Sequence, residues 1–283
     1  MDLPPTHSPP THWPVAFAEE FEELHLADRS DAATWATTYP WGARTNAGNR
    51  ELQLYLDRGW RDRNGRPGAS DPFSVEGGVL TITARQLPVE ERGRHEGFRY
   101  VSGIITTYPS FAQTYGYFEM RARLPAGRGL WPAFWLLPVS QRWPPEIDVF
   151  ETVGQRPEEV AMTLHSGAGG RHSQVQHTHR GIDTSAGFHT YGLAWTPATI
   201  TWYLDGRRVA QAETPPDMHQ PMYMLANLAV GGTMPGRPAA ATPFPAEFRI
   251  DYVRAYRMPE PQGAAQGRQD SPGRAPAEGA GLP

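Results

Sequence analysis

The sequence contains no cysteine and no lysine. Without cysteine the chain forms neither disulfides nor thiolate metal sites, although this absence leaves its cellular compartment open. Its 26 basic residues, all of them arginine, face 30 acidic residues, and the formal net charge of -4 is small for 283 residues. No basic stripe interrupts this balance, so nucleic acid is not an expected partner.

Long apolar runs are missing as well. No stretch reaches the roughly 18 apolar residues of a membrane span, so we expect no such span. The first five residues, Met1 to Pro5, lack the basic region followed by an apolar run that begins a secretory signal. We therefore expect no signal peptide in this part of the chain.

Short segments with strand-like patterns, separated by turns, fill the middle of the chain. Glycine and proline each occur 29 times, and the apolar residues recur with the two-residue period of strands. The expected strands are residues 17–21, 49–55, 79–84, 100–107, 115–124, 131–138, 146–151, 160–165, 188–195, 199–204, 207–209, 222–230 and 247–257. Residues 167–187, rich in glycine and histidine, predict an irregular loop. The pattern indicates an all-β, jelly-roll β-sandwich with a concave substrate cleft.

The two ends of the chain differ in composition from the middle. Residues 1–12 are rich in proline, threonine and histidine and predict a flexible leader. Residues 259–283 consist largely of proline, glycine, alanine and glutamine and predict a disordered tail. Residues 13–258 are left for one domain, which is a size that single β-sandwiches reach. We expect this domain to be a monomer.

Three carboxylates lie within a run that otherwise predicts a buried strand, Glu146-Ile147-Asp148-Val149-Phe150-Glu151. The two-residue period places Glu146 and Asp148 on one face and Glu151 on the other. A β-bulge at Val149 and Phe150 would restore the phase and set all three acids in a row. Acids in a strand more often form its solvated face. Three neighbouring carboxylates repel one another, however, and two glutamates flanking an aspartate suit glycoside hydrolysis.

Aromatic and polar residues around this run have two interpretations each. Trp131 and Trp135 are four residues apart, and Trp143 lies in the turn before the carboxylates. Such tryptophans are consistent with plain core packing and with platforms for sugar rings. His165, after the following strand, is more often a hydrogen-bonded structural residue than a catalyst. Asn227, flanked by apolar residues, either caps a bend or faces a ligand.

Several further segments follow in a definite order along the chain: Asn49–Gln53, Tyr115–Glu119, Gly129–Trp135, Asn227–Gly232 and Asp251–Arg254. Together with the carboxylate run they resemble glycoside hydrolase family 16, the bacterial laminarinase-like enzymes with a bulged E-I-D-x-x-E strand. The similarity covers roughly residues 13–258. This resemblance implies a jelly-roll sandwich and retaining endo-hydrolysis of β-glycosidic bonds.

The resemblance also implies roles for individual residues. Glu146 is expected to be the nucleophile, Glu151 the acid/base, and Asp148 the residue that holds and tunes Glu146 by hydrogen bonding. The implied sugar-binding residues are Asn49, Trp131, Trp135, Trp143 and His165. Glu20 and Asp251 match positions that help to hold a structural calcium in many members, which suggests a structural calcium here. No cofactor is expected for catalysis.

The resemblance implies a polysaccharide substrate, with a β-1,3-glucan or a mixed β-1,3/1,4-glucan as the first choice. Pro145, Met234 and Ile104 depart from the usual laminarinase pattern, and these departures concern the substrate. The segment Trp143–Glu146 is similar to relatives associated with bacterial exopolysaccharide, so a depolymerase or transglycosylase of such a polymer is an alternative. A non-catalytic glucan-binding module is a remote alternative, because all three acids are present. A polymer substrate leads us to expect an extracellular or periplasmic location.

Overall fold

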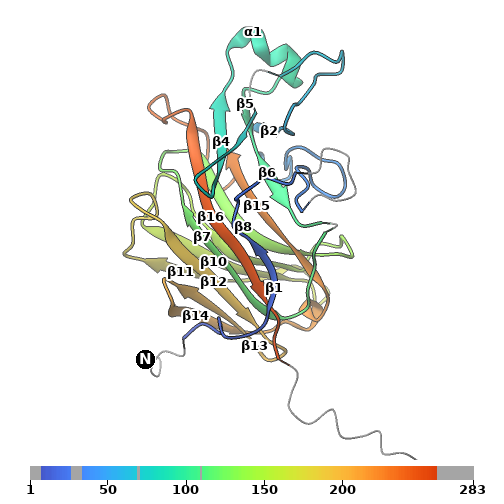
Figure 1. Cartoon of the computed structure of the whole chain (residues 1–283), viewed down its shortest axis with the longest axis vertical. Coiled ribbons are helices and arrows are strands. Elements are labelled where there is room, and N and C mark those ends of the chain that lie inside the picture. Colours follow the sequence, from blue (N-terminus) through green and yellow to red (C-terminus); the bar gives the residue numbers. More distant parts are fainter. Residues whose placement is uncertain (1–7, 27–33, 69–70, 109, 260–283) are drawn as a thin grey trace, which may run out of the picture.

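The structure is a computed structural model that describes residues 8–26, 34–68, 71–108 and 110–259. Two twisted sheets pack face to face (Figure 1). The larger sheet contains, from edge to edge, β14 (Arg207–Glu213), β13 (Thr199–Leu204), β12 (His189–Trp195), β7 (Gly116–Arg123), β16 (Ala246–Tyr256), β4 (Val79–Gln86), β5 (Tyr100–Ser102) and β2 (Gln53–Tyr55), with β1 (Val15–Glu19) beside β16 and β3 (Phe73–Glu76) beside β4. The smaller sheet contains β11 (Ser173–Arg180), β10 (Glu159–Ser166), β9 (Glu146–Glu151), β8 (Leu130–Pro138), β15 (Met222–Val230) and β6 (Ile104–Thr106).

Helical structure within the described residues is confined to three short turns: α1 (Val89–Arg92), η1 (Gly93–His95) and η2 (Pro216–Met218). In Figure 1, α1 lies at one end of the molecule, beyond β4 and β5. None of these described helices has the length and apolar character that crossing a membrane requires. The prediction of an all-β sandwich is confirmed.

The hydrophobic core lies between the two sheets, and strand alternation explains which side chains enter it. In β8, Leu130, Phe134 and Leu136 are fully buried in this core. Trp131 and Trp135, at the intervening positions, line cavities on the opposite face of the smaller sheet. Because side chains alternate across a strand, this second face is free to carry polar and aromatic groups. It therefore becomes the place for a binding site.

One extra residue interrupts the two-residue period in β9. Along β10, Ala161 pairs with Glu151 and Thr163 pairs with Asp148, so two steps in β10 correspond to three in β9. The pairing of β9 with β8 shifts at the same place. The two residues between Asp148 and Glu151 are both buried in the core. The predicted β-bulge is confirmed. It sets all three carboxylates on the face of the smaller sheet opposite the core, which is called the free face below.

The bulge residues should contribute to stability through burial. We expect Val149→Ala to lower the free energy of unfolding by about 2 kcal/mol, because it removes two buried carbon atoms at about 0.8 kcal/mol each and leaves a small cavity. Val175→Ala is a matched control, since Val175 is 50% exposed in β11 and should change stability by less than about 0.5 kcal/mol. Urea denaturation followed by fluorescence measures both values. Equal losses in the two variants would contradict the role of the bulge in the core.

The predicted irregular loop over residues 167–187 is wrong in its middle, where β11 forms. This strand is the edge of the smaller sheet and pairs with β10 alone. All of its residues are exposed or half-buried. A strand without a buried face has no reason to alternate apolar and polar residues, so its sequence carries no periodic signal. Of the predicted leader and tail, residues 1–7 and 260–283 lie outside the described residues.

Candidate active site

The three carboxylates of β9 lie in a cleft on the free face of the smaller sheet. The side chain of Asp148 is 3% exposed and that of Glu146 is 17% exposed. Burial raises the pKa of all three carboxyl groups, since it removes water from the charged form. The charge of Asp148 raises the pKa of Glu146 further, and the charge of Glu151 raises the pKa of Asp148. The group as a whole therefore keeps a proton at a pH at which exposed carboxyls are ionised.

Two indole N–H groups donate hydrogen bonds to the outer two carboxylates. Trp131 Nε1 lies 3.0 Å from Glu151 Oε1, and Trp143 Nε1 lies 2.9 Å from Glu146 Oε2. A donor beside a carboxylate favours its charged form, so each bond lowers the pKa of the glutamate that accepts it. Trp131 is buried, whereas Trp143 is 56% exposed. Trp143 can therefore hold Glu146 and still offer ring surface to a ligand.

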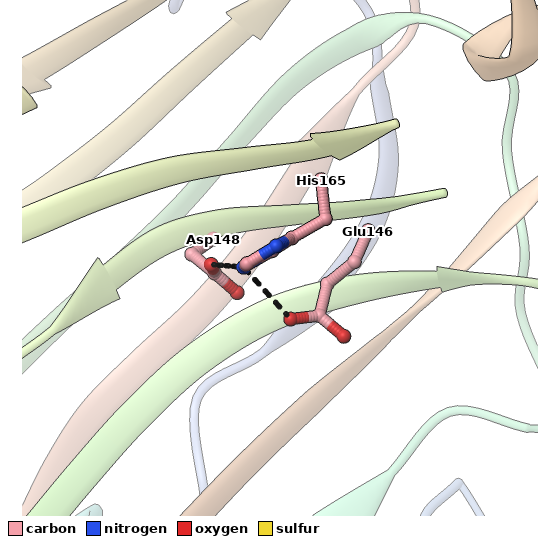
Figure 2. Close-up of side chains that lie close together, drawn as sticks. All are labelled: Glu146, Asp148 and His165. Carbon is pink, nitrogen blue, oxygen red and sulfur yellow. Dashed lines mark ion pairs between the residues drawn. The ribbon is translucent and has the colours of Figure 1, made fainter. Parts of the chain in front are cut away.

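His165, on β10, reaches between the first two carboxylates (Figure 2). Its Nε2 lies 3.7 Å from Glu146 Oε1 and 3.6 Å from Asp148 Oδ2. Its Nδ1 lies 2.9 Å from Nε2 of His172, and the two imidazole rings stack with their centroids 5.2 Å apart. The charge of a protonated His165 lowers the pKa of Glu146 and that of Glu151. His165 is thus part of the carboxylate cluster.

Trp135 lies on the same face but bonds to a different partner. Its Nε1 donates to Asn227 Oδ1 at 2.8 Å, and Asn227 Nδ2 donates to the hydroxyl of Tyr55 at 3.0 Å. That hydroxyl lies 3.5 Å from Glu51 Oε2. Asn227 lies within β15 and lines a cavity together with the three acids. Of the two interpretations of Asn227, the one in which it faces a ligand site fits the structure.

All five predicted sugar-binding residues line cavities next to the carboxylates. One cavity of about 520 Å³ extends from Glu146 past Trp135 to the Leu137 end of β8. Another of about 480 Å³ contains Trp131, Glu151 and His165. Asn49 and Trp143 line both cavities. Space on both sides of the acids suits a polymer that continues past the point of cleavage.

Several residues that are absent from the predicted set also line this cleft, and Trp41 and Glu51 are two of them. Trp41 is 54% exposed, lines the cavity of about 520 Å³ and stacks on Tyr39 with ring centroids 4.7 Å apart. Glu51 lines a cavity with the three acids, and it accepts a hydrogen bond of 2.6 Å from Gln53 Nε2. Burial raises the pKa of Glu51. Of the strand expected over 49–55, the structure forms only Gln53–Tyr55 (β2), and Glu51 lies just before it. Polar and apolar residues alternate over 49–55, which is the sequence signal for Glu51, whereas Trp41 lies in a segment without periodicity.

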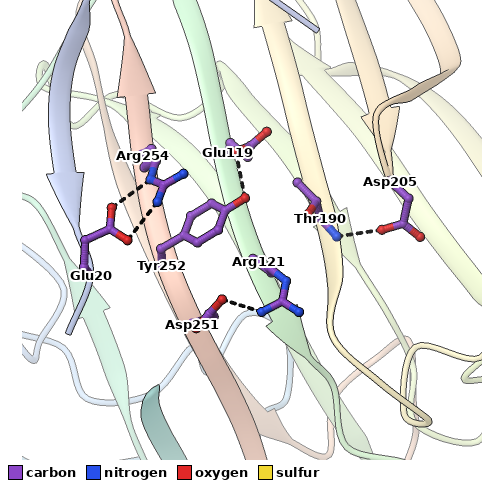
Figure 3. Close-up of polar contacts among 8 residues, drawn as sticks. All are labelled: Glu20, Glu119, Arg121, Thr190, Asp205, Asp251, Tyr252 and Arg254. Carbon is purple, nitrogen blue, oxygen red and sulfur yellow. Dashed lines mark hydrogen bonds and ion pairs between the residues drawn. The ribbon is translucent and has the colours of Figure 1, made fainter. Parts of the chain in front are cut away.

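The two residues predicted to hold calcium contact arginines (Figure 3). Glu20 accepts hydrogen bonds from Arg254 Nε at 2.7 Å and from the Arg254 terminal nitrogen at 2.9 Å. Asp251 forms an ion pair with Arg121. Each arginine supplies the positive charge that a calcium ion would bring, and it would repel such an ion. The side chains at these two positions therefore do not fit a calcium site. The structural calcium remains a prediction from the sequence.

The sequence model described as Glycosyl hydrolases family 16 matches residues 43–254 of the chain. This span contains the bulged strand and every predicted sugar-binding residue. The chain belongs to glycosyl hydrolase family 16. The resemblance that the sequence motifs indicate is thereby confirmed.

Curated proteins are similar to this chain over most of its length. Over 246 residues the chain is 47% identical to endo-1,3-1,4-beta-glycanase EglC of Rhizobium meliloti. The matched region covers 86% of this chain and 51% of that protein. Over 273 residues it is 36% identical to a beta-glucanase of Rhodothermus marinus, and this match covers 88% of this chain and 87% of that protein. The chain thus spans about half the length of EglC.

Among solved structures, the laminarinase from Rhodothermus marinus shares the fold. Its TM-score with this chain is 0.73 at 34% sequence identity, and the match covers 88% of this chain and 99% of that one. The fold of this chain therefore matches nearly the whole of that laminarinase structure. The predicted jelly-roll sandwich is confirmed.

Proposed function

We propose that this family 16 member is a retaining endo-glycosidase that hydrolyses β-glycosidic bonds in a β-1,3-glucan or a mixed β-1,3/1,4-glucan. The observation that carries the proposal is the bulged strand β9, which sets Glu146, Asp148 and Glu151 together in the middle of a cleft. The names of the relatives, an endo-1,3-1,4-beta-glycanase and a beta-glucanase, support this substrate class.

In the first step, Glu146 attacks the anomeric carbon while Glu151 donates a proton to the leaving glycosidic oxygen. Burial and the charge of Asp148 raise the pKa of Glu146, while the nearby His165 and the hydrogen bond from Trp143 act against that rise and favour the charged form that a nucleophile needs. Burial raises the pKa of Glu151, which favours the protonated form that an acid needs. The product of this step is a glycosyl-enzyme intermediate bonded through Glu146.

In the second step, Glu151 acts as a base and takes a proton from the water that attacks the same carbon. The bond to Glu146 breaks, and the sugar keeps its original β configuration. Asp148 lies beside Glu146, and in this cycle it holds the Glu146 carboxylate in position and adjusts its pKa. Two glutamates and one water molecule balance every proton and electron pair in the cycle, so the proposed reaction needs no cofactor.

Reducing-end release by the purified chain tests the proposal. Laminarin, lichenan, carrageenan, agarose and a succinoglycan-like polymer are compared at equal mass, with Glu146→Gln as the inactive control. Activity on laminarin or lichenan that disappears in the control would support the proposal. Activity on the succinoglycan-like polymer alone would keep the mechanism and favour the exopolysaccharide depolymerase. Binding to glucan without reducing-end release from any polymer would favour the glucan-binding module.

The two indole donors provide a prediction that separates the roles of the two glutamates. In Trp131→Phe the hydrogen bond to Glu151 is lost, so the pKa of the acid should rise and the basic limb of the kcat/KM profile should move to higher pH. In Trp143→Phe the bond to Glu146 is lost, so the pKa of the nucleophile should rise and the acidic limb should move to higher pH.

Each variant serves as the control for the other, because both exchange an indole for a phenyl ring in the same cleft. We expect kcat/KM at the pH optimum to fall about 10–100-fold in each, which is the worth of one hydrogen bond to a charged group. The profiles are recorded on the best polymer from the substrate comparison. Movement of the same limb in both variants would contradict the assignment of acid and nucleophile.

A further inference from the structure

Three potential metal ligands converge at the carboxylate cluster (Figure 2). Glu146, Asp148 and His165 each offer one ligand atom, and these three atoms lie within 4.8 Å of one another. His165 Nε2 is 3.7 Å from Glu146 Oε1 and 3.6 Å from Asp148 Oδ2. The side chains come from two adjacent strands, β9 and β10, whose pairing fixes their spacing.

An independent observation concerns Asp148 Oδ2. This oxygen is buried and has no hydrogen-bond partner among the described residues. The residue as a whole is 2% exposed. A buried carboxylate oxygen without a donor lacks the stabilisation that burial normally demands. Because it faces the imidazole nitrogen at 3.6 Å, a cation placed between the two atoms would supply what this oxygen lacks.

The distances from the imidazole nitrogen to the two carboxylates suit a small transition-metal ion. Bonds of about 2.0–2.1 Å at a tetrahedral angle put two ligand atoms about 3.3–3.4 Å apart. The two distances from His165 Nε2, 3.7 and 3.6 Å, are close to that value. One imidazole with two carboxylates suits zinc or a similar divalent ion, whereas calcium and magnesium prefer oxygen ligands alone. The cavity lined by Glu146 and His165 would give a fourth ligand, such as water, room to reach the ion.

His172 completes the arrangement around the imidazole. A metal-binding histidine usually donates its second ring N–H to a neighbouring acceptor, which fixes the ring and its tautomer. His165 Nδ1 lies 2.9 Å from His172 Nε2. If His165 Nε2 gives its lone pair to a metal, Nδ1–H donates to His172. The stacked histidine pair therefore orients the Nε2 lone pair toward the two carboxylates.

We propose that Glu146, Asp148 and His165 form a reversible binding site for a divalent zinc-like cation, and that occupation of this site inhibits hydrolysis. The metal would take the lone pair of the Glu146 carboxylate that otherwise attacks the anomeric carbon, so inhibition is competitive with polymer. The inhibitory consequence rests on the proposed function, whereas the binding itself does not. Free zinc in the surroundings would then regulate polymer degradation.

The test measures binding and activity separately. Isothermal titration calorimetry with ZnCl₂ at neutral pH should show one site per wild-type chain. His165→Gln should weaken the affinity by more than about 100-fold, because it removes a direct ligand, and His172→Ala by about 10–100-fold, because it removes the support of that ligand. His189→Gln is the matched control, since His189 on β12 of the larger sheet pairs with Asp205, whose Oδ2 lies 2.7 Å from His189 Nδ1. This control should bind zinc as the wild type does.

Several outcomes decide the proposal. If His165→Gln binds zinc like the wild type, the metal occupies other histidines and the proposal is overturned. A loss in His189→Gln with retention in His165→Gln would overturn it as well. If thermal melting without metal shows that His165→Gln does not fold, Asp148→Asn takes its place with the same expected loss. Calorimetric binding without any hydrolase activity would support the metal site while rejecting the proposed function. Inhibition that EDTA reverses would support both.

Discussion

Replacement of Glu146 by alanine should lower kcat/KM for the polymer by at least about 10⁴-fold, since the variant lacks the group that forms the glycosyl-enzyme bond. Glu151→Ala should lose about 10³–10⁴-fold on a polymer. It should lose much less on an aryl glycoside with an acidic leaving group, because such a group departs without a proton. The contrast between the two substrates distinguishes acid from nucleophile.

Azide gives a sharper separation. In Glu151→Ala, azide can enter the space of the missing carboxylate and attack the glycosyl-enzyme, which yields a β-glycosyl azide. In Glu146→Ala, azide replaces the nucleophile and attacks the substrate directly, which yields an α-glycosyl azide. Proton NMR of the products with an aryl glycoside reads the configuration at the anomeric carbon. The same anomer from both variants would contradict the retaining mechanism with these assignments.

A surface glutamate provides the control for these large effects. Glu213 is exposed at the end of β14, in the sheet that does not carry the cleft. Glu213→Ala should retain wild-type kcat/KM and produce no azide adduct. If it lost activity to a similar degree, the losses in the β9 variants would reflect folding rather than chemistry.

Features of the site that depend on local sequence can be predicted without a structure. The spacing of Glu146, Asp148 and Glu151 conflicts with the two-residue period, and a bulge is the smallest change that reconciles a buried strand with three acids on one face. The structure has this bulge, with both intervening residues in the core. The alternation of β8 likewise predicts two rows of side chains, one in the core and one in the cleft.

Features that depend on contacts distant in sequence could not be predicted in this way. Glu20 meets Arg254 across 234 positions, and Asp251 meets Arg121 across 130. No local sequence pattern predicts such an ion pair. A residue that matches a calcium-binding position of the family therefore does not show, from the sequence, that an arginine lies beside it. Trp41 is similar, because its place on the cleft follows from stacking on Tyr39 and not from any periodicity.

The strand β11 shows a different limit. Hydrophobic periodicity predicts strands only where one face is buried, and β11 lies at the edge of its sheet with exposed side chains on both faces. Its pairing with β10 is complete over eight positions, from Glu159 opposite Arg180 to Ser166 opposite Ser173. Backbone pairing with β10 defines this strand, and such pairing leaves little trace in residue type.

Asp148→Asn should lower kcat/KM at the pH optimum by about 10²–10³-fold, the typical effect of altering one polar group at the reacting centre. It should also move the acidic limb of the profile. Burial is the main cause that raises the pKa of Glu146, and the negative charge of Asp148 is the second. Asparagine carries no charge, so the pKa of Glu146 falls. Because the nucleophile must be ionised, the variant keeps its remaining activity to lower pH than the wild type.

A matched control is Asp205→Asn, which neutralises an aspartate in the turn between β13 and β14 and should leave the acidic limb in place. An acidic limb that stays at the same pH or moves to higher pH in Asp148→Asn would mean that Asp148 carries no negative charge beside Glu146 in the free protein.

The stability of Asp148→Asn provides a second measurement. The pKa of Asp148 is raised in the folded state, so its ionisation destabilises the fold progressively as the pH rises through the range in which it titrates. Asparagine removes that cost, and the free energy of unfolding at neutral pH should rise while activity falls. A residue that served structure alone would lower both.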